Sequence, residues 1–332
     1  MTTIGTTAAP SAAFAEPHRA VTGGWVAAFA AAWLGVWMAQ LGPFQVLLPV
    51  QVDTELGLTG GTWTDSVVAF GIISGIAGAC AIVAFPLTGY LSDRTTSKLG
   101  RRRPWVIGGA ALFAASLVAL GFVHGIVLIA LFWSLAIVGF CILASALTAL
   151  ISDLVPVRQR GFVSGWMSAP QAVGIILGVL LITEVFVTVM FGYVAMAIGL
   201  AILVIPVLVA TKEIPITREE RPASSVSAFF HGLWISPKKH PDFAWTLASR
   251  VLVNMGNALG TSLLLYYLAF GLNIGIENAE EALLPLIAVY LVGVVLSSLI
   301  VGYLSDRMAR RKAFVIAGSI AQAVAAFVLV FV

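Results

Sequence analysis

Uncharged polar side chains inside long apolar runs are the first residues of this sequence that could do chemistry. They are amides, a hydroxyl and an indole, and they occur at Trp37, Gln40, Gln171, Asn254, Asn257 and Thr261. An amide in apolar surroundings needs a hydrogen-bond partner or water. Aromatic faces beside neutral hydrogen-bonding groups suit a sugar, whose ring faces are apolar and whose hydroxyls donate and accept. Hydrogen bonding between packed helices is the alternative interpretation.

Three ionisable residues near the apolar runs could carry a proton or contact an ion. Asp65 begins one run, Glu184 ends another, and Arg250 shares a helix face with the two asparagines because it lies four and seven residues before them. Each has a simpler interpretation. Asp65 would cap a helix N-terminus, Glu184 would lie at the outer rim, and Arg250 would extend its charge to the inner interface.

A repeated hexapeptide indicates that the chain contains two related halves. Gly-Tyr-Leu-Ser-Asp-Arg occurs at Gly89–Arg94 and again at Gly302–Arg307. Each copy ends an apolar run, and a basic cluster follows each one. A carboxylate at such a position can be held by a helix N-terminus and by arginines, and the glycines would let neighbouring helices approach closely.

The composition is that of an all-helical membrane protein. The 332 residues are 60% hydrophobic and 10% charged, whereas soluble domains carry about 25% charged residues. Only helices or closed barrels satisfy backbone groups in lipid. The two cysteines lie in apolar runs and indicate no disulfide framework. There is no Gly-rich phosphate loop, metal-ligand spacing or nucleophile–base set, so we expect neither an enzyme nor a cofactor.

Nine apolar segments are each long enough to span a bilayer. We place them at 24–50, 66–90, 105–124, 126–150, 163–185, 188–210, 243–271, 283–304 and 313–332. With these spans, all 18 lysines and arginines fall on the side of the N-terminus. The positive-inside rule therefore predicts a cytoplasmic N-terminus in a multi-pass protein of the cell membrane.

The spans divide the chain into four regions. We expect a disordered cytoplasmic tail at 1–22, a six-helix bundle at 23–210, a proline-containing cytoplasmic linker at 211–242, and three further helices at 243–332. The Ala/Val/Gly-rich composition favours a bacterial source.

The arrangement resembles the major facilitator superfamily. The two hexapeptides occupy the loops after the second and eighth spans, where that family carries its signature motif, and the segment from Ser152-Asp153 to Arg160-Gly161 is similar to its loop after the fourth span. The resemblance implies two pseudo-symmetric bundles of six helices. Nine of the twelve spans would be present, and the last three would be lacking.

The resemblance is closest to the sugar–cation symporters, in the glycoside–pentoside–hexuronide and sucrose-transporter-like branch. The segments 93–104 and 236–245 carry it. It implies a cytoplasmic gate that locks the halves together during the transport cycle, with Asp153 as an arginine partner. The gate residues would be Gly89, Asp93, Arg94, Arg103, Asp153, Gly302, Asp306 and Arg307. Arg101 and Arg102 we interpret chiefly as topology signals.

The resemblance implies a secondary active transporter that works by alternating access and takes up a sugar or glycoside together with protons. Its partners would be a small-molecule substrate, a proton and the lipid bilayer, without nucleic acid. Two alternatives stay open. One is an efflux transporter for drugs or metabolites of the same superfamily, and the other is a truncated copy that does not transport.

Overall fold

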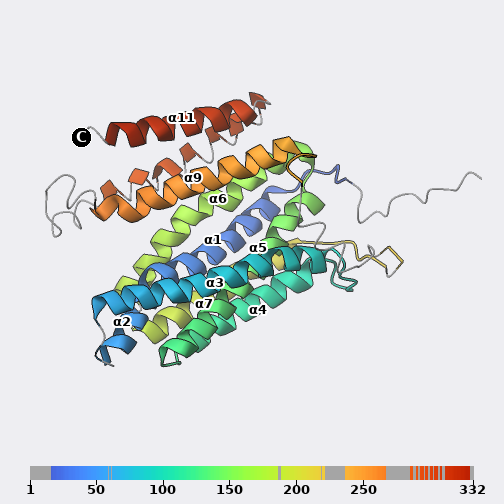
Figure 1. Cartoon of the computed structure of the whole chain (residues 1–332). Coiled ribbons are helices and arrows are strands. Elements are labelled where there is room, and N and C mark those ends of the chain that lie inside the picture. Colours follow the sequence, from blue (N-terminus) through green and yellow to red (C-terminus); the bar gives the residue numbers. More distant parts are fainter. Residues whose placement is uncertain are drawn as a thin grey trace, which may run out of the picture. The chain divides into compact units, whose positions relative to one another are not determined.

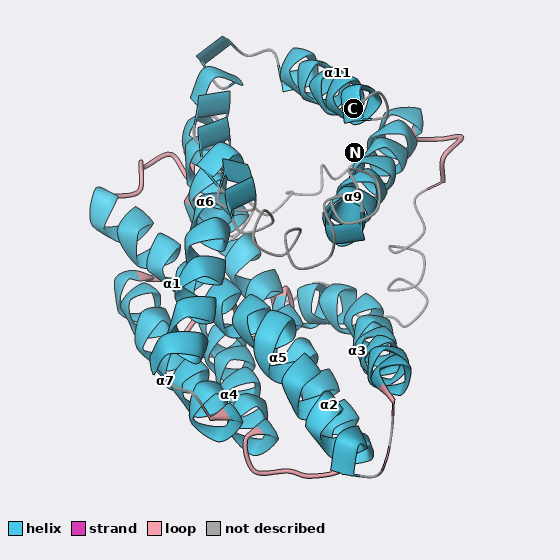
Figure 2. Cartoon of the chain, turned by 90° about the vertical axis from the view of Figure 1, so that its left-hand side faces the viewer, coloured by secondary structure: helices cyan, strands magenta, loops and turns pink. Residues whose placement is uncertain are grey.

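The computed structural model describes residues 16–58, 60, 62–185, 188–217, 219–220, 236–266 and 311–329, with short stretches between 285 and 308. Within these residues, helices are the only regular secondary structure (Figure 2). The chain divides into two compact units, Met1–Ala223 and Ser224–Val332. Each unit is described by itself.

Six helical segments of the first unit are long and apolar enough to cross a membrane, counted over the described residues. They are α1 (Gly23–Gly42) continued by η1 (Pro43–Leu47) and α2 (Leu48–Leu58), α3 (Trp63–Ser92), α4 (Arg103–Leu120), α5 (Ile126–Leu154), α6 (Val157–Leu180) continued by η2 (Leu181–Val185), and α7 (Val189–Ala210). These segments coincide with the first six spans predicted from the sequence, within a few residues at most ends.

Local side-chain caps explain where several of these helices begin. Thr22 Oγ1 accepts a hydrogen bond from the backbone N–H of Trp25 at the start of α1, and Thr188 does the same for α7. Thr62 and Asp65 form a capping box at the start of α3. Such caps satisfy N–H groups that have no partner within the helix.

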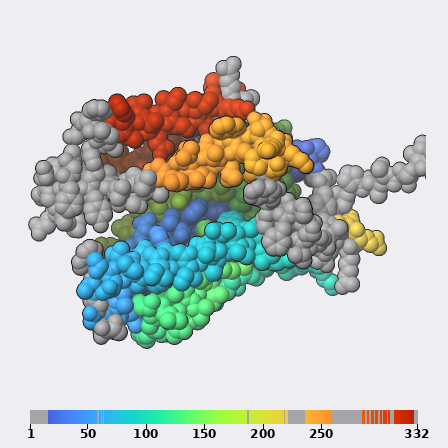
Figure 3. Space-filling model, viewed as in Figure 1, coloured from blue at the N-terminus to red at the C-terminus, as the bar shows by residue number. Residues whose placement is uncertain are grey.

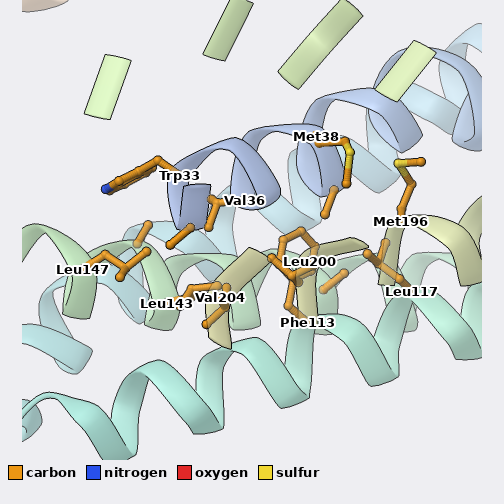
Figure 4. Packing of buried hydrophobic residues seen from close by; sticks show 14 of the residues in the cluster. Trp33, Val36, Met38, Phe113, Leu117, Leu143, Leu147, Met196, Leu200 and Val204 are labelled. Carbon is orange, nitrogen blue, oxygen red and sulfur yellow. The ribbon is translucent and has the colours of Figure 1, made fainter. Parts of the chain in front are cut away.

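The six segments pack around one core in the order α6, α1, α7, α4, α5, α3. α1 lies against α6 and α7, α4 lies against α5 and α7, and α3 lies against α5 (Figure 1). Figure 4 shows side chains of α1, α4, α5 and α7 interdigitating at the centre. Its labelled residues are Trp33, Val36, Met38, Phe113, Leu117, Leu143, Leu147, Met196, Leu200 and Val204.

The α4–α5 crossing is close because both helices carry a glycine there. A Cβ atom added to Gly109 would lie 2.6 Å from the backbone N of Leu143, and one added to Gly139 would lie 2.5 Å from the backbone N of Phe113. Both distances are far below a van der Waals contact. Small residues of this kind let helix backbones approach in membrane proteins.

α3 lies at the surface of the first unit along its length, where it is drawn in blue to cyan (Figure 3). Many of its large apolar side chains are exposed, among them Val67, Ile72 and Ile82. In a bilayer such side chains would contact lipid or another helix.

The second unit contains α9 (Pro241–Tyr266) and α11 (Arg311–Leu329). α9 and α11 overlap the predicted spans 243–271 and 313–332, and pieces of helix occur within 283–304. These three spans, and therefore the total of nine, stay a prediction.

Candidate inner gate and substrate site

Arg102 joins three spans at the end of the first unit that the positive-inside rule predicts to be cytoplasmic. This end is called the inner end below, and the opposite end is called the outer end. Its Nε donates to Asp153 Oδ2 at 2.8 Å, its Nη1 donates to Ser92 Oγ, and its Nη2 donates to Asp93 Oδ1. The side chain is only 5% exposed. Ser92 is the last residue of α3 and Asp93 its C-cap, Asp153 lies one residue before the end of α5, and Arg102 immediately precedes α4.

Asp153 is shared between two arginines. Its Oδ2 also forms an ion pair with Arg101, whose Nη2 lies 2.8 Å away. Burial works to lower the pKa of Arg102, but the hydrogen bonds and charges of Asp153 and Asp93 outweigh it and raise that pKa above its ordinary value. Asp93, Arg101, Arg102 and Asp153 are joined by these ion pairs and are here called the inner cluster.

The sequence analysis chose Arg103 as the gate arginine, but the side chain that reaches Asp93 and Asp153 is that of Arg102. Arg102 is the N-cap residue of α4, and Pro104 lies in the first turn, where proline is well tolerated. Arg103 is thus the first helical residue, and its Nε is buried without a hydrogen-bond partner among the described residues. Arg101 and Arg102 are more than topology signals, because both side chains are buried in ion pairs.

Two more basic residues bind backbone groups at this end. Arg94 Nη1 donates to the carbonyl of Tyr90 at 2.9 Å, and its guanidinium lies 3.6 Å from the centroid of the Tyr90 ring. Arg160 donates to the carbonyls of Val155 and Ser152 at 3.0 and 3.1 Å. A cation at these carbonyls stabilises the C-terminus of α5.

Gly89 does not mark a close helix approach within the first unit. An added Cβ atom would find Ser145 Oγ as its nearest neighbour, at an ordinary 3.9 Å. The close-approach interpretation is therefore wrong for this glycine within the described part of the unit.

Glu213, three residues after α7, is a member of this region that the sequence reasoning missed. Its Oε2 accepts from the backbone N–H of Arg102 at 2.6 Å, and its Oε1 accepts from that of Arg103 at 3.0 Å. An acidic residue next to the end of a span on the basic side of the protein was the available signal. Acidic residues contribute little to topology, so such a residue calls for another explanation.

The second copy of the motif falls in the second unit. Arg307 is exposed there, while Gly302 and Asp306 lie outside the described residues. Their gate role stays a prediction.

The candidate substrate residues of the first unit centre on Trp37. Its indole is half-buried, and Nε1 donates to the carbonyl of Met167 on α6 at 3.0 Å. The ring lies 5.7 Å from that of Trp33 and 5.9 Å from that of Phe140 on α5, centroid to centroid. Trp37 therefore brings together α1, α5 and α6.

Three buried polar atoms of α1 and α6 have no hydrogen-bond partner among the described residues. They are Gln40 Oε1, Trp33 Nε1 and Trp166 Nε1. Gln40 follows Trp37 by about one helical turn, and Trp166 precedes Met167 in the chain. Buried polar groups are normally paired with protein or water, so unpaired ones beside aromatic rings can receive the hydroxyls of a ligand. The sequence reasoning selected Gln40 but not Trp166.

Of the other predicted substrate contacts, one lies further along α6 and the rest fall in the second unit. Gln171 is half-buried on α6, after Pro170. In the second unit Arg250 and Asn254 are exposed, and Asn257 Oδ1 accepts from the hydroxyl of Tyr290 at 3.1 Å. The side chain of Thr261 lies outside the described residues.

The two carboxylates considered for ion coupling lie at the outer ends of helices. Asp65 Oδ2 accepts from both the backbone N–H and the hydroxyl of Thr62, each at 2.8 Å, which is the capping arrangement. Glu184 is exposed in η2. Another outer carboxylate, Glu55, binds His124 Nδ1 at 3.0 Å and the backbone N–H of Gly125 at 2.8 Å. It fixes the turn between α4 and α5.

Comparison with known families agrees with this architecture. The family model described as Major Facilitator Superfamily matches residues 25–332. The chain belongs to the major facilitator superfamily. It is thus a multi-pass membrane protein of a transporter family rather than of an enzyme family, and the inner cluster lies at the loop in which this superfamily carries its signature motif.

A solved superfamily structure shows the same fold. It is the proton:xylose symporter XylE bound to 6-bromo-6-deoxy-D-glucose, with a TM-score of 0.52 and 15% sequence identity. The match covers 83% of this chain and 68% of that chain.

Proposed function

We propose that this superfamily member is a secondary active transporter that takes up a sugar or glycoside together with protons by alternating access. The observation that carries the proposal is the set of buried polar atoms on α1 and α6 that have no hydrogen-bond partner among the described residues, namely Gln40 Oε1, Trp33 Nε1 and Trp166 Nε1. Sugar hydroxyls would supply the missing hydrogen bonds, and sugar ring faces would pack on the half-buried Trp37.

The inner cluster supports the alternating-access part of the proposal. It joins the inner ends of α3, α4 and α5 through ion pairs. Because hydrogen bonds to charged groups are directional, a small displacement of one helix end would break them. Gly89, Asp93, Arg94 and Asp153 are then gate residues of the first half, with Gly302, Asp306 and Arg307 as counterparts in the second.

The remaining assignments follow the same proposal. Gln171, Asn254, Asn257 and Thr261 are proposed sugar contacts. Proton coupling is supported by the likeness to XylE, which is described as a proton symporter. Asp65, Glu184 and Arg250 are the candidate coupling groups. The protein would lie in a bacterial cell membrane with its N-terminus in the cytoplasm.

The decisive experiment measures uptake of a labelled disaccharide into proteoliposomes that contain the full chain, under an inward proton gradient. We expect uptake that a protonophore abolishes. Gln40→Ala should raise KM about tenfold, because one hydrogen bond to the sugar is lost and about 1.4 kcal/mol corresponds to a factor of ten. Trp37→Phe should raise KM as well.

Trp25→Phe is the matched control. Trp25 is another tryptophan of α1, but it is buried and its Nε1 already donates to Thr211 Oγ1 at 3.2 Å. Its replacement should leave KM unchanged. Equal KM values for the wild type and for Gln40→Ala would contradict the proposed sugar site, and uptake that resists the protonophore would contradict proton coupling.

A further inference from the structure

The segment that follows α7 is packed onto the first unit. Thr211 and Ile216 are 2% and 4% exposed, and Trp25 of α1 donates to the Thr211 hydroxyl. We call residues 211–216 the strap. It begins where α7 ends and passes the start of α1, so it contacts the inner ends of two spans.

Glu213 of the strap caps a third span. The first backbone N–H groups of a helix have no partner within the helix, and the side chain of the N-cap residue Arg102 provides no cap for α4. The carboxylate of Glu213 accepts from the N–H groups of Arg102 and Arg103 instead, although it lies 111 residues after Arg102 in the chain. A negative charge is favourable at this end of a helix dipole.

The loop before α4 is shaped around Glu213. Gly100 has φ +102°, a conformation that favours glycine. A Cβ atom built on it would lie 2.5 Å from Glu213 Cβ and 2.6 Å from Glu213 Oε2. Position 100 therefore needs glycine for two reasons, and one of them is the presence of Glu213.

The backbone segment that Glu213 binds, at Arg102 and Arg103, also carries the arginine side chains of the inner cluster. Arg102 donates its N–H to Glu213, and its guanidinium reaches Asp93 and Asp153. We propose that Glu213 is a positioning residue for the inner gate, which holds the start of α4 so that Arg101 and Arg102 can close the inner ends of α3 and α5. This inference rests on the proposed transport cycle. In that cycle, movement of the end of α7 pulls the strap away and releases the gate arginines.

Global stability alone does not account for a carboxylate at this place. Burial raises the pKa of Glu213 above its usual value, and the charge of Asp153 on α5 adds to the rise, while the amides of Arg101–Arg103 lower it. The balance is a net cost for the charged form. The guanidiniums of Arg101 and Arg102 point to Asp153 and Asp93 rather than to Glu213, and the neighbouring Lys212 is exposed.

The test is hydrogen–deuterium exchange of the full chain in nanodiscs, combined with initial-rate uptake. Glu213→Ala removes both acceptor oxygens and should speed exchange of the Arg102 and Arg103 amides by roughly tenfold or more. A tenfold change corresponds to a smaller free energy than the loss of one charge-assisted hydrogen bond, so the expected effect is a lower bound. Glu213→Gln keeps one acceptor oxygen and should restore most of the protection. In uptake, Glu213→Ala should lower kcat and leave KM unchanged, since no sugar contact is altered.

Glu55→Ala is the matched control, because Glu55 is a carboxylate that caps a distant amide at the outer end of the same unit. It should speed exchange at Gly125 and leave residues 101–103 unchanged. The proposal is overturned if exchange at Arg102 and Arg103 is the same in Glu213→Ala and in the wild type. It is also overturned if Glu55→Ala affects those amides equally. The exchange result does not depend on uptake, so failure of the proposed transport function would be seen separately.

Discussion

Replacing Arg102 by alanine should loosen the inner end of the first unit more than any other single charge removal there. The guanidinium binds Ser92, Asp93 and Asp153 and is almost wholly buried. It therefore joins the ends of α3 and α5. The expected result is a destabilised bundle with a gate that no longer closes.

The magnitude follows from the exposure of each partner. Asp93 is 48% exposed, so its bond to Arg102 is screened and contributes at most about 1 kcal/mol. Asp153 is 18% exposed, and a hydrogen bond between charged groups at such a site contributes about 1.5–3 kcal/mol. Because Asp153 keeps Arg101 as a partner, the larger cost of an unpaired buried charge is not reached. We expect a loss of about 2–4 kcal/mol.

Reversible unfolding in detergent micelles measures this loss. A double-mutant cycle with Asp153→Ala should give a coupling free energy of about 1–2 kcal/mol for the pair. Arg158→Ala, an exposed arginine at the same end of the unit, is the control and should cost less than about 0.5 kcal/mol. The reasoning is refuted if Arg102→Ala costs no more than this control, or if the cycle shows no coupling.

Two further predictions concern packing and pH. Gly139→Ala would place a Cβ atom 2.5 Å from the backbone N of Phe113 and should destabilise by about 1–3 kcal/mol, whereas Gly108→Ala on α4, with nothing within 4 Å, should be neutral or stabilising. Thermal unfolding of both variants checks this, and equal midpoints would contradict the close α4–α5 crossing. The raised pKa of Glu213 means that the folded state binds its proton more tightly than the unfolded state, so its contribution to stability is greatest below the ordinary glutamate pKa and is lost as pH rises toward the raised value. The stability of the wild type relative to Glu213→Gln should therefore increase as pH falls toward the ordinary glutamate pKa, and a flat or opposite trend would refute the sign.

The spans of the first unit could be predicted because their signal is local and strong. Each is a long apolar run, and a membrane leaves helices as the simplest way to satisfy the backbone. Their ends were less certain, since polar caps extend a helix beyond the apolar run. α3 begins at Trp63, before the predicted residue 66, because Thr62 and Asp65 cap it. The capping interpretation of Asp65 was already available from the sequence.

The gate arginine could not be chosen from three consecutive arginines by the motif alone. Which of them faces the carboxylates depends on the residue at which α4 begins. Pro104 limits the start of α4 to the residues just before it, because proline is favoured in the first helical turn and cannot donate a backbone hydrogen bond. Its preferred first position would make Arg103 the N-cap residue, whereas in the structure Pro104 is the second helical residue and Arg102 is the N-cap. The chemistry of the inner cluster was therefore predictable, but the choice of arginine was not.

Glu213 marks where prediction from the sequence ends. Its partners are the backbone amides of Arg102 and Arg103, which lie more than a hundred residues earlier in the chain. Because nearly every residue has a backbone N–H, no sequence motif identifies these two as partners. Gly100 hints at a special conformation, but the reason for it appears only when the strap is in place. In the proposed mechanism, the gate is determined at two levels. The motif supplies the charges of the inner cluster, and the end of α7 supplies the position from which those charges act. On this view a variant can keep every residue of the signature motif and still lose the gate, and Glu213→Ala is that variant.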